Sequence, residues 1–364
     1  MFSYYNDEDR ALESMLDRVA LAAPGVADGL ERNPDVKTFP VHFPDWQYGF
    51  LHEAAVISYH GTLFASWYNC PREELILRSP IRERRSKDGG RTWSEPHLLA
   101  DDPSGSILYC PPVYGVCDDT LYMLMNEMVS PDHIHALNLY RYDEKTETYA
   151  LLWSRPIPFK LNTNVISLPN GKLMLPGRIA EMDGFPNTPA VLISDSGKID
   201  AKWRLVRLQE SGALPDGSEL VHPEISAVLD GNRVYMFCRD DRRRVPLVYF
   251  SDDCGEHWTR PMAHNLPLSD SKIYAGDLSD GRHYLIANLY PGRSRLAVFF
   301  SAPGKPYFDR GFLLQDGLSE AFPVLSGRQW SYPAAWEQDG FLYVIYTAEI
   351  KSPIRGALMS VIPL

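Results

Sequence analysis

Residues 339–347 read DGFLYVIYT, a tight Asp-Gly turn followed by a short strand of large apolar residues. Five earlier stretches repeat this pattern at intervals of 50 to 60 residues: HGTLFASW from His60, DDTLYMLMN from Asp118, NGKLMLPGR from Asn170, DGNRVYMFCR from Asp230 and DGRHYLIAN from Asp280. Asn-Gly and Asp-Gly supply the positive-φ positions that tight hairpin turns require. Six units predict an all-β fold, a six-bladed β-propeller with four strands in each blade. A β-sandwich is the alternative, but it gives no reason for so regular a spacing.

The two ends of the chain complete this picture. Residues 8–22 predict a short amphipathic helix outside the propeller, with one apolar face made of Leu12, Met15, Leu16 and Val19. The C-terminal GALMSVIPL (356–364) predicts a strand that closes the ring with an N-terminal segment such as KTFPVHF (37–43), because an unpaired edge is a liability. We therefore divide the chain into an N-terminal extension with a short helix, residues 1–40, and a propeller catalytic domain, residues 41–364.

Composition and charge exclude several classes of partner. The 364 residues carry a formal net charge of -11, so nucleic acid is not expected to bind. No apolar run reaches the roughly 18 residues that a membrane span needs. The acidic N-terminus lacks the basic start of a signal peptide, which predicts a cytoplasmic location, although a secreted protein without its leader would read the same. Five scattered cysteines indicate neither a disulfide framework nor a zinc site, and we expect no metal and no cofactor.

Two hairpins carry a more specific signature. Residues 86–93 read SKDGGRTW and match the Asp-box S-x-D-x-G-x-T-W, and residues 251–258 read SDDCGEHW, with His257 in place of the threonine. The aspartate is expected to cap the amides of its own turn, the glycine to take a left-handed conformation, and the tryptophan to pack between blades. Segments from Ser194 and Ser301 look like decayed copies. The box is therefore a marker of the fold and not a catalytic site, despite its acids.

With these repeats and boxes the chain resembles the sialidase superfamily of BNR-repeat proteins over about residues 45–364. The resemblance implies a carbohydrate substrate bound at the channel mouth. It also implies three arginines that hold a carboxylate, a tyrosine nucleophile assisted by a glutamate, and an aspartate acid/base. The activity expected from it is that of an exo-acting glycoside hydrolase that releases a terminal, acidic sugar from a glycan. A homo-oligomer is compatible with the sequence.

Part of the family's residue set can be carried over. HPEISAVLDGNRVYMFCRDD matches the family's glutamate and second arginine, which gives Glu224 and Arg239 at the ends of adjacent strands. GRSRLAVFFS gives Arg293 as the third arginine, and SYPAAWEQDGFLYVIYT gives Tyr332 as the nucleophile. Glu224 would take the proton of Tyr332, because a neutral phenol is a poor nucleophile. The arginine forks would bind a carboxylate in a bidentate manner. For each residue alone, a salt bridge or a core contact is the alternative.

The first blade departs from the family pattern. GFLHEAAVISYHGTLFASW has His52 and Glu53 where the family has its first arginine, and both are candidate substrate-binding residues. NCPREELILRSPIRERR has no aspartate, so either Glu73 or Glu74 is the candidate proton donor. Because the arginine triad is incomplete, the resemblance does not extend to sialic acid as the substrate.

Further contacts and two other functions follow from the same pattern. Arg178 in the third repeat, Arg243 in the basic run after Arg239, and Tyr274 before the fifth repeat are predicted at the channel mouth. The first blade also resembles propeller enzymes that act on rhamnose–glucuronate linkages, some of them lyases. A lyase would use His52, Tyr332 and the arginines to neutralise a uronate and remove its C5 proton. A propeller that only binds glycans is the other alternative.

Overall fold

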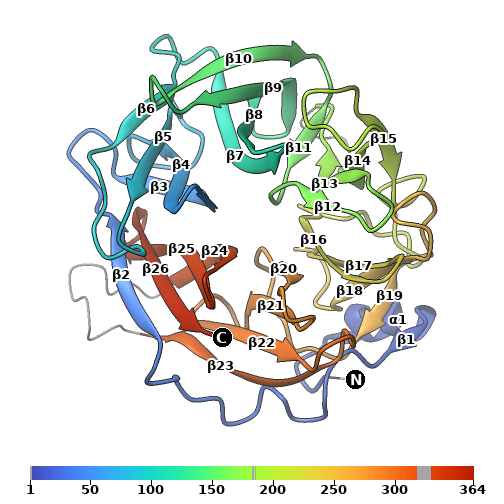
Figure 1. Ribbon diagram of the computed structural model, residues 1–364. Helices are drawn as coiled ribbons and strands as arrows, with labels where there is room; N and C mark the ends of the chain where they lie inside the picture. The colour runs from blue at the N-terminus through green and yellow to red at the C-terminus, as the bar shows by residue number, and fades with distance from the viewer. Residues whose placement is uncertain (1, 183, 185, 318–328) are drawn as a thin grey trace.

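The computed structural model describes residues 2–182, 184, 186–317 and 329–364, and its six sheets stand around a central channel as a six-bladed β-propeller (Figure 1). The predicted fold is confirmed. Blade 1 contains β3 (Phe50–Tyr59), β4 (Thr62–Cys70), β5 (Ile81–Ser86) and β6 (His97–Ala100). Blade 2 contains β7 (Leu108–Cys117), β8 (Thr120–Ser130), β9 (His133–Asp143) and β10 (Thr148–Arg155). Blade 3 contains β11 (Phe159–Leu161), β12 (Ile166–Ser167), β13 (Leu173–Ile179), β14 (Thr188–Ser194) and β15 (Arg204–Arg207).

The second half of the chain forms the other three blades. Blade 4 contains β16 (Ile225–Asp230), β17 (Arg233–Cys238), β18 (Leu247–Ser251) and β19 (Met262–His264), with β1 (Arg18–Val19) at its outer edge. Blade 5 contains β20 (Tyr274–Asp277), β21 (His283–Asn288), β22 (Arg295–Ser301) and β23 (Phe308–Asp316). Blade 6 contains β24 (Gln329–Gln338), β25 (Phe341–Lys351) and β26 (Ile354–Pro363), completed by β2 (Lys37–His42).

The repeated turn and apolar strand of the sequence form the same element in every blade. Each begins the second strand, namely β4, β8, β13, β17, β21 and β25. These strands are buried over most of their length because each blade packs against a neighbour on both faces. The apolar core accordingly lies between blades: one cluster joins blades 5, 6 and 1, and others join blades 3 with 4 and 1 with 2.

The ring closes as predicted. β2 pairs antiparallel with β26, so the N-terminal segment supplies the outer strand of the last blade. The boundary that we placed at residue 40 therefore falls within β2. Before β2, the chain runs along the outside of blade 5 and forms single bridges to β23 at Ala22 and Arg32 (Figure 1).

The predicted helix is shorter than its apolar pattern suggested. Asn6 caps helix α1 (Asp7–Met15) through a reciprocal pair of hydrogen bonds with Asp9. Leu12 and Leu16 are buried, but Met15 is 56% exposed and Val19 belongs to β1, so the predicted extent to residue 22 is wrong. The chain leaves the helix because β1 gains a parallel partner in β19. Within the described ranges, no helix has the length and apolar character to cross a membrane.

The two Asp-boxes have the expected geometry. Asp88 accepts hydrogen bonds from the Thr92 amide at 2.9 Å and from its hydroxyl at 2.6 Å. In the second box, His257 replaces that hydroxyl with its Nδ1, 2.7 Å from Asp253. Each tryptophan packs against a core cluster that includes an adjacent blade. The boxes therefore hold hairpins and blades together.

Candidate functional site

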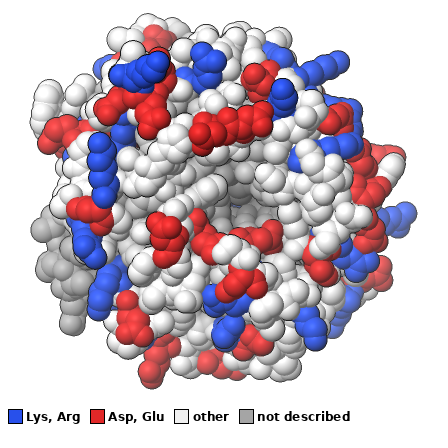
Figure 2. Space-filling view, viewed as in Figure 1, with Lys and Arg blue, Asp and Glu red and all other residues white. Residues whose placement is uncertain are grey.

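One end of the central channel holds a cavity of about 440 Å³ whose lining is mostly charged. The central channel opens at the centre of the face shown in Figure 2. All six blades contribute at least one residue to the cavity: Glu53, Glu74, Leu75, Pro131, Asp132, Lys160, Arg178, His222, Glu224, Arg239, Asp241, Arg293 and Tyr332. A cavity with this lining suits a polar ligand.

Tyr332 and Glu53 reach the cavity from corresponding places in blades 6 and 1. β24 and β3 each have a β-bulge at this point, and a bulge redirects the side chain that it carries. Both residues have a left-handed backbone, with φ of 55° for Tyr332 and 47° for Glu53. This conformation costs a non-glycine residue roughly 1–3 kcal/mol, and such strain clusters at functional sites. The shared distortion marks both side chains as functional candidates.

Arg239 joins Tyr332 to Glu224. Its Nη1 donates to the Tyr332 hydroxyl at 2.7 Å and also to the Glu224 carboxylate. The β16–β17 hairpin explains the pairing, because the register that sets Ile225 opposite Cys238 sets Glu224 opposite Arg239 one step further. Glu224, Arg239 and Tyr332 are 3%, 5% and 7% exposed. The phenol and the carboxylate are therefore neighbours around one nitrogen, as the nucleophile and base of the prediction require.

Asp241 holds the other side of the same guanidinium. Arg239 donates from Nε and Nη2 to the two Asp241 oxygens at 2.5 and 2.7 Å, and His222 Nδ1 lies 2.7 Å from the same carboxylate. Neither Asp241 nor His222 was among the site residues predicted from the sequence. Asp241 stands two residues after Arg239, in the sequence RDD, and this spacing was the available signal.

The charges define the resting protonation states. Burial acts to raise the pKa of Glu224, but the charge of Arg239, with smaller effects of Lys272 and Arg178, outweighs burial and lowers the pKa to about 2. Burial raises the pKa of Tyr332 above its ordinary value, against the opposing charge of Arg239. At neutral pH the site therefore pairs a carboxylate with a neutral phenol.

His52 lies behind Tyr332 and is absent from the cavity lining. The two ring centroids are 3.9 Å apart, and His52 Nδ1 lies 3.1 Å from the Thr347 hydroxyl. Burial, followed by the charges of Arg355 and other cations, lowers the pKa of His52 well below its ordinary value. The imidazole is therefore neutral and packs against the tyrosine ring.

Three acids of the first blade occupy different environments. Glu53 lines the cavity, with Lys272 Nζ 3.5 Å away and the thiol of Cys110 donating to it at 3.6 Å. Glu74 also lines the cavity and accepts a hydrogen bond from the Tyr68 hydroxyl at 3.1 Å. Glu73 is exposed and does not line the cavity. Of the two candidate proton donors, only Glu74 lines the cavity.

Arg293 and Arg178 both line the cavity, as the sequence analysis predicted. The Arg293 guanidinium lies 5.4 Å from the centre of the Tyr332 ring and donates to the Asp270 carbonyl at 3.2 Å. Arg178 donates to Asp132 at 3.3 Å, and both residues line the cavity. Among the described residues, no group of three or more His, Cys, Asp or Glu is arranged to hold a metal ion.

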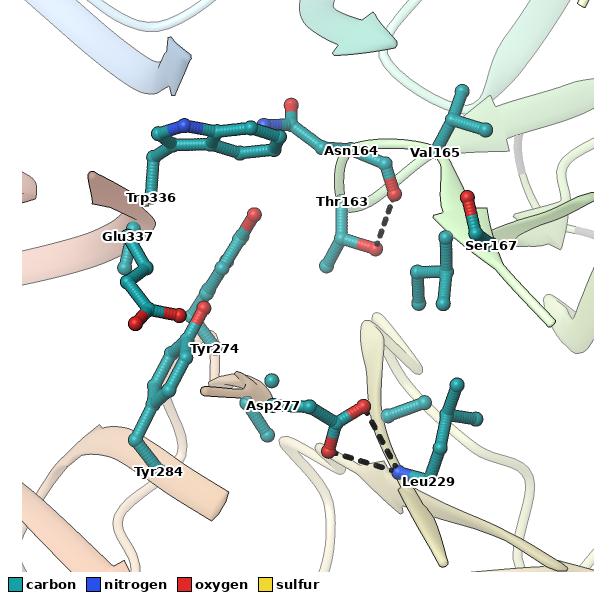
Figure 3. Close-up of a pocket in the computed structure, with 15 residues that line it drawn as sticks. Thr163, Asn164, Val165, Ser167, Leu229, Tyr274, Asp277, Tyr284, Trp336 and Glu337 are labelled. Carbon is teal, nitrogen blue, oxygen red and sulfur yellow. Dashed lines mark hydrogen bonds between the residues drawn. The ribbon is translucent and has the colours of Figure 1, made fainter. Parts of the chain in front are cut away.

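The structure places the other two predicted contacts elsewhere. Arg243 pairs with Asp216 at 3.0 Å and with Glu8 of α1 at 2.8 Å, and it does not line the cavity. Tyr274 lines a second cavity of about 320 Å³, where Figure 3 shows its ring between Trp336 and Tyr284. This second cavity lies toward the other end of the inner strands.

Comparisons with known proteins agree with the fold. A family model described as a BNR repeat-like domain matches residues 61–344. The chain belongs to this family. No curated protein matches the sequence significantly. The solved structures similar to this BNR propeller include a Dyadobacter fermentans protein of unknown function, with a TM-score of 0.70 and 15% identity, covering 91% of this chain and 100% of that one.

Sialidases are also among the similar structures. Trypanosoma rangeli sialidase has a TM-score of 0.67 and 14% identity, over 91% of this chain and 60% of that one. The Hadza microbial sialidase Hz136 has a TM-score of 0.68 and 13% identity, over 87% of this chain and 66% of that one. The chain thus spans less than two thirds of either sialidase. At these identities the likeness establishes a sialidase-like propeller fold.

Proposed function

We propose that this BNR propeller is an exo-acting glycoside hydrolase that uses Tyr332 as its nucleophile and releases a terminal, acidic sugar. The observation that carries the proposal is the bonding of the Tyr332 hydroxyl and the Glu224 carboxylate to one nitrogen of Arg239, inside a cavity that a sugar can enter. A neutral phenol suits attack on a sugar that itself carries negative charge, because it brings no like charge to the reacting carbon.

The first step forms a glycosyl–tyrosine. The Tyr332 oxygen bonds to the anomeric carbon while the bond from that carbon to the leaving oxygen breaks. The phenolic proton passes to Glu224, and Glu74 donates a proton to the leaving oxygen. Arg239 remains hydrogen-bonded to Glu224 and Tyr332, and it stabilises the negative charge that develops on the phenolic oxygen as its proton leaves.

The second step restores the enzyme. Glu74, now a carboxylate, removes a proton from a water molecule, whose oxygen bonds to the anomeric carbon as the bond to Tyr332 breaks. Glu224 returns its proton to the phenolate. Two displacements at one carbon give a sugar of retained configuration.

The test is turnover of a panel of 4-nitrophenyl glycosides, including glucuronide, galacturonide and sialoside, by the wild-type protein and two matched variants. Tyr332→Phe removes the reacting hydroxyl, and the rate should fall on the order of 10³-fold or more. Tyr274→Phe makes the same change in the second cavity and should leave the rate unaltered. Equal turnover by Tyr332→Phe and wild type would overturn the proposal. An unsaturated uronate product would do the same, and would establish a lyase.

The location and the assembly of the protein are also proposals. The sequence predicts a cytoplasmic protein and is compatible with a homo-oligomer, and fractionation of the native host together with light scattering of the purified protein would test them.

A further inference from the structure

Two buried cations stand side by side in blade 3. The β11–β13 register sets Lys160 directly opposite Arg178, and these residues are 5% and 2% exposed. Like charges directly opposite on adjacent strands destabilise a sheet. Burial of each ion adds a desolvation cost that needs compensation by good pairing. Taken by itself, this pair of cations lowers the stability of the folded protein.

The chain satisfies these two cations incompletely. Lys160 Nζ donates to the Pro131 carbonyl at 3.1 Å, and Arg178 Nη2 donates to Asp132 at 3.3 Å. The Arg178 Nε and Nη1 atoms are buried and have no hydrogen-bond partner. Buried guanidinium donors are rarely left unpaired, because each costs free energy when it is removed from water without an acceptor. The site lacks an acceptor for two N–H groups.

The other cations of the cavity are engaged differently. Arg239 has Nε and Nη2 on the two Asp241 oxygens and Nη1 on Glu224 and Tyr332. Arg293 is partly exposed, so water can satisfy its remaining donors. Lys160 and Arg178 both line the cavity, so an acid group that enters it gains most beside this incompletely paired pair of cations.

We propose that Lys160 and Arg178 form a subsite for the carboxylate of the substrate sugar, a hexuronic acid, across the cavity from Tyr332. The identity of the ligand as a sugar rests on the proposed function. The carboxylate would accept hydrogen bonds from Arg178 and neutralise the excess charge of the Lys160–Arg178 pair. This assignment places acid recognition in blade 3, rather than on Arg239 and Arg293 as the family resemblance implies.

Calorimetric titration of the Tyr332→Phe protein with D-glucuronate and D-glucose tests the subsite without turnover. Glucuronate should bind at least tenfold more tightly than glucose. Arg178→Met in the same background should weaken glucuronate binding roughly ten- to a hundredfold, as expected for lost charge-assisted hydrogen bonds. Arg204→Met is the matched control, because Arg204 lies on the outer strand of the same blade and pairs with Asp195 and Glu256. Its affinity should stay unchanged.

A second measurement guards against a variant that fails to fold. Lys160→Met removes one of two opposed charges, so the free protein should melt at a higher temperature while its glucuronate affinity falls. Equal affinity for glucose and glucuronate, or full glucuronate affinity in both Arg178→Met and Lys160→Met, would overturn the subsite. The subsite would also be overturned if Arg293→Met lost glucuronate affinity while Arg178→Met and Lys160→Met kept it. If the protein binds glucuronate more tightly than glucose but hydrolyses no glycoside, the subsite stands and the hydrolase proposal fails. If it hydrolyses charged and uncharged glycosides at equal rates, the hydrolase proposal stands and the subsite fails.

Discussion

Replacing Arg239 with methionine removes the cation that Glu224, Tyr332 and Asp241 share. Glu224 is 3% exposed, so in the variant it becomes a buried carboxylate without its main counter-charge. Breaking a buried pair in this way costs about 3–5 kcal/mol of unfolding free energy. Adding Glu224→Gln to the Arg239→Met protein removes the stranded charge. The double variant should therefore recover about 1–3 kcal/mol, the range of coupling between contacting residues.

Urea unfolding of the wild type, the two single variants and the double variant measures the coupling between Arg239 and Glu224. Its dependence on pH shows whether the charge of Glu224 is the cause. In the wild type, the pKa of Glu224 is lowered from 4.5 to about 2, so its contribution is present above pH 4.5 and is lost as the pH falls toward 2. In Arg239→Met the largest lowering charge is absent and burial should raise the pKa of Glu224, so that protein should gain stability relative to the wild type as the pH falls and the carboxyl is protonated. The deficit of the variant should therefore narrow between pH 7 and pH 4.5. A double variant no more stable than Arg239→Met, or a deficit that is independent of pH, would refute this reasoning.

Three further substitutions test other parts of the structure. Asp88→Asn should raise the pH at which acid unfolds the protein, as measured by fluorescence. The hydrogen bonds to Asp88 outweigh burial and lower its pKa from 3.8 to about 2. The stability that the Asp88 carboxylate contributes is therefore present above pH 3.8 and is lost as the pH falls toward 2. Glu83→Ala should cost about 3–5 kcal/mol in urea unfolding, because the fully buried carboxylate accepts hydrogen bonds from Arg85 and two tyrosines. His52→Phe keeps the ring against Tyr332 but loses the bond to Thr347, so kcat should fall by up to about tenfold with KM unchanged. An equal rise in KM would instead place His52 in substrate binding.

The fold could be predicted because its signals are local. Each Asp-Gly or Asn-Gly turn sets one hairpin, and six hairpins at similar intervals define six blades. The helix prediction failed beyond Met15 because the pairing of β1 with β19 joins residues some 245 positions apart, and no local pattern reports such a contact. The segment from Ser194 no longer matches the Asp-box motif. Its tryptophan, Trp203, nevertheless donates to a turn carbonyl as the tryptophans of the intact boxes do, so the structure keeps a contact that the motif no longer reports.

The candidate site was predictable where a motif fixed it and not elsewhere. Glu224 and Arg239 face each other because one hairpin register sets them opposite. Lys160 was missed, since a lone lysine in a three-residue strand carries no signal until the neighbouring strand is known. Tyr274 was predicted at the channel mouth but lines the second cavity. In blade 5 it is Lys272, two residues earlier, that lies near Glu53 of the charged cavity.

The most direct test of the central claim is to trap the covalent intermediate. The wild-type protein would be incubated with 2-deoxy-2-fluoroglucuronosyl fluoride, whose fluorine slows the second step more than the first, and then digested for peptide mass spectrometry. We predict one added fluorosugar on the peptide that contains Tyr332, and none in the Tyr332→Phe protein. Turnover of a glucuronide with no adduct on Tyr332, or an adduct on Glu74 or Glu224 instead, would contradict a tyrosine nucleophile.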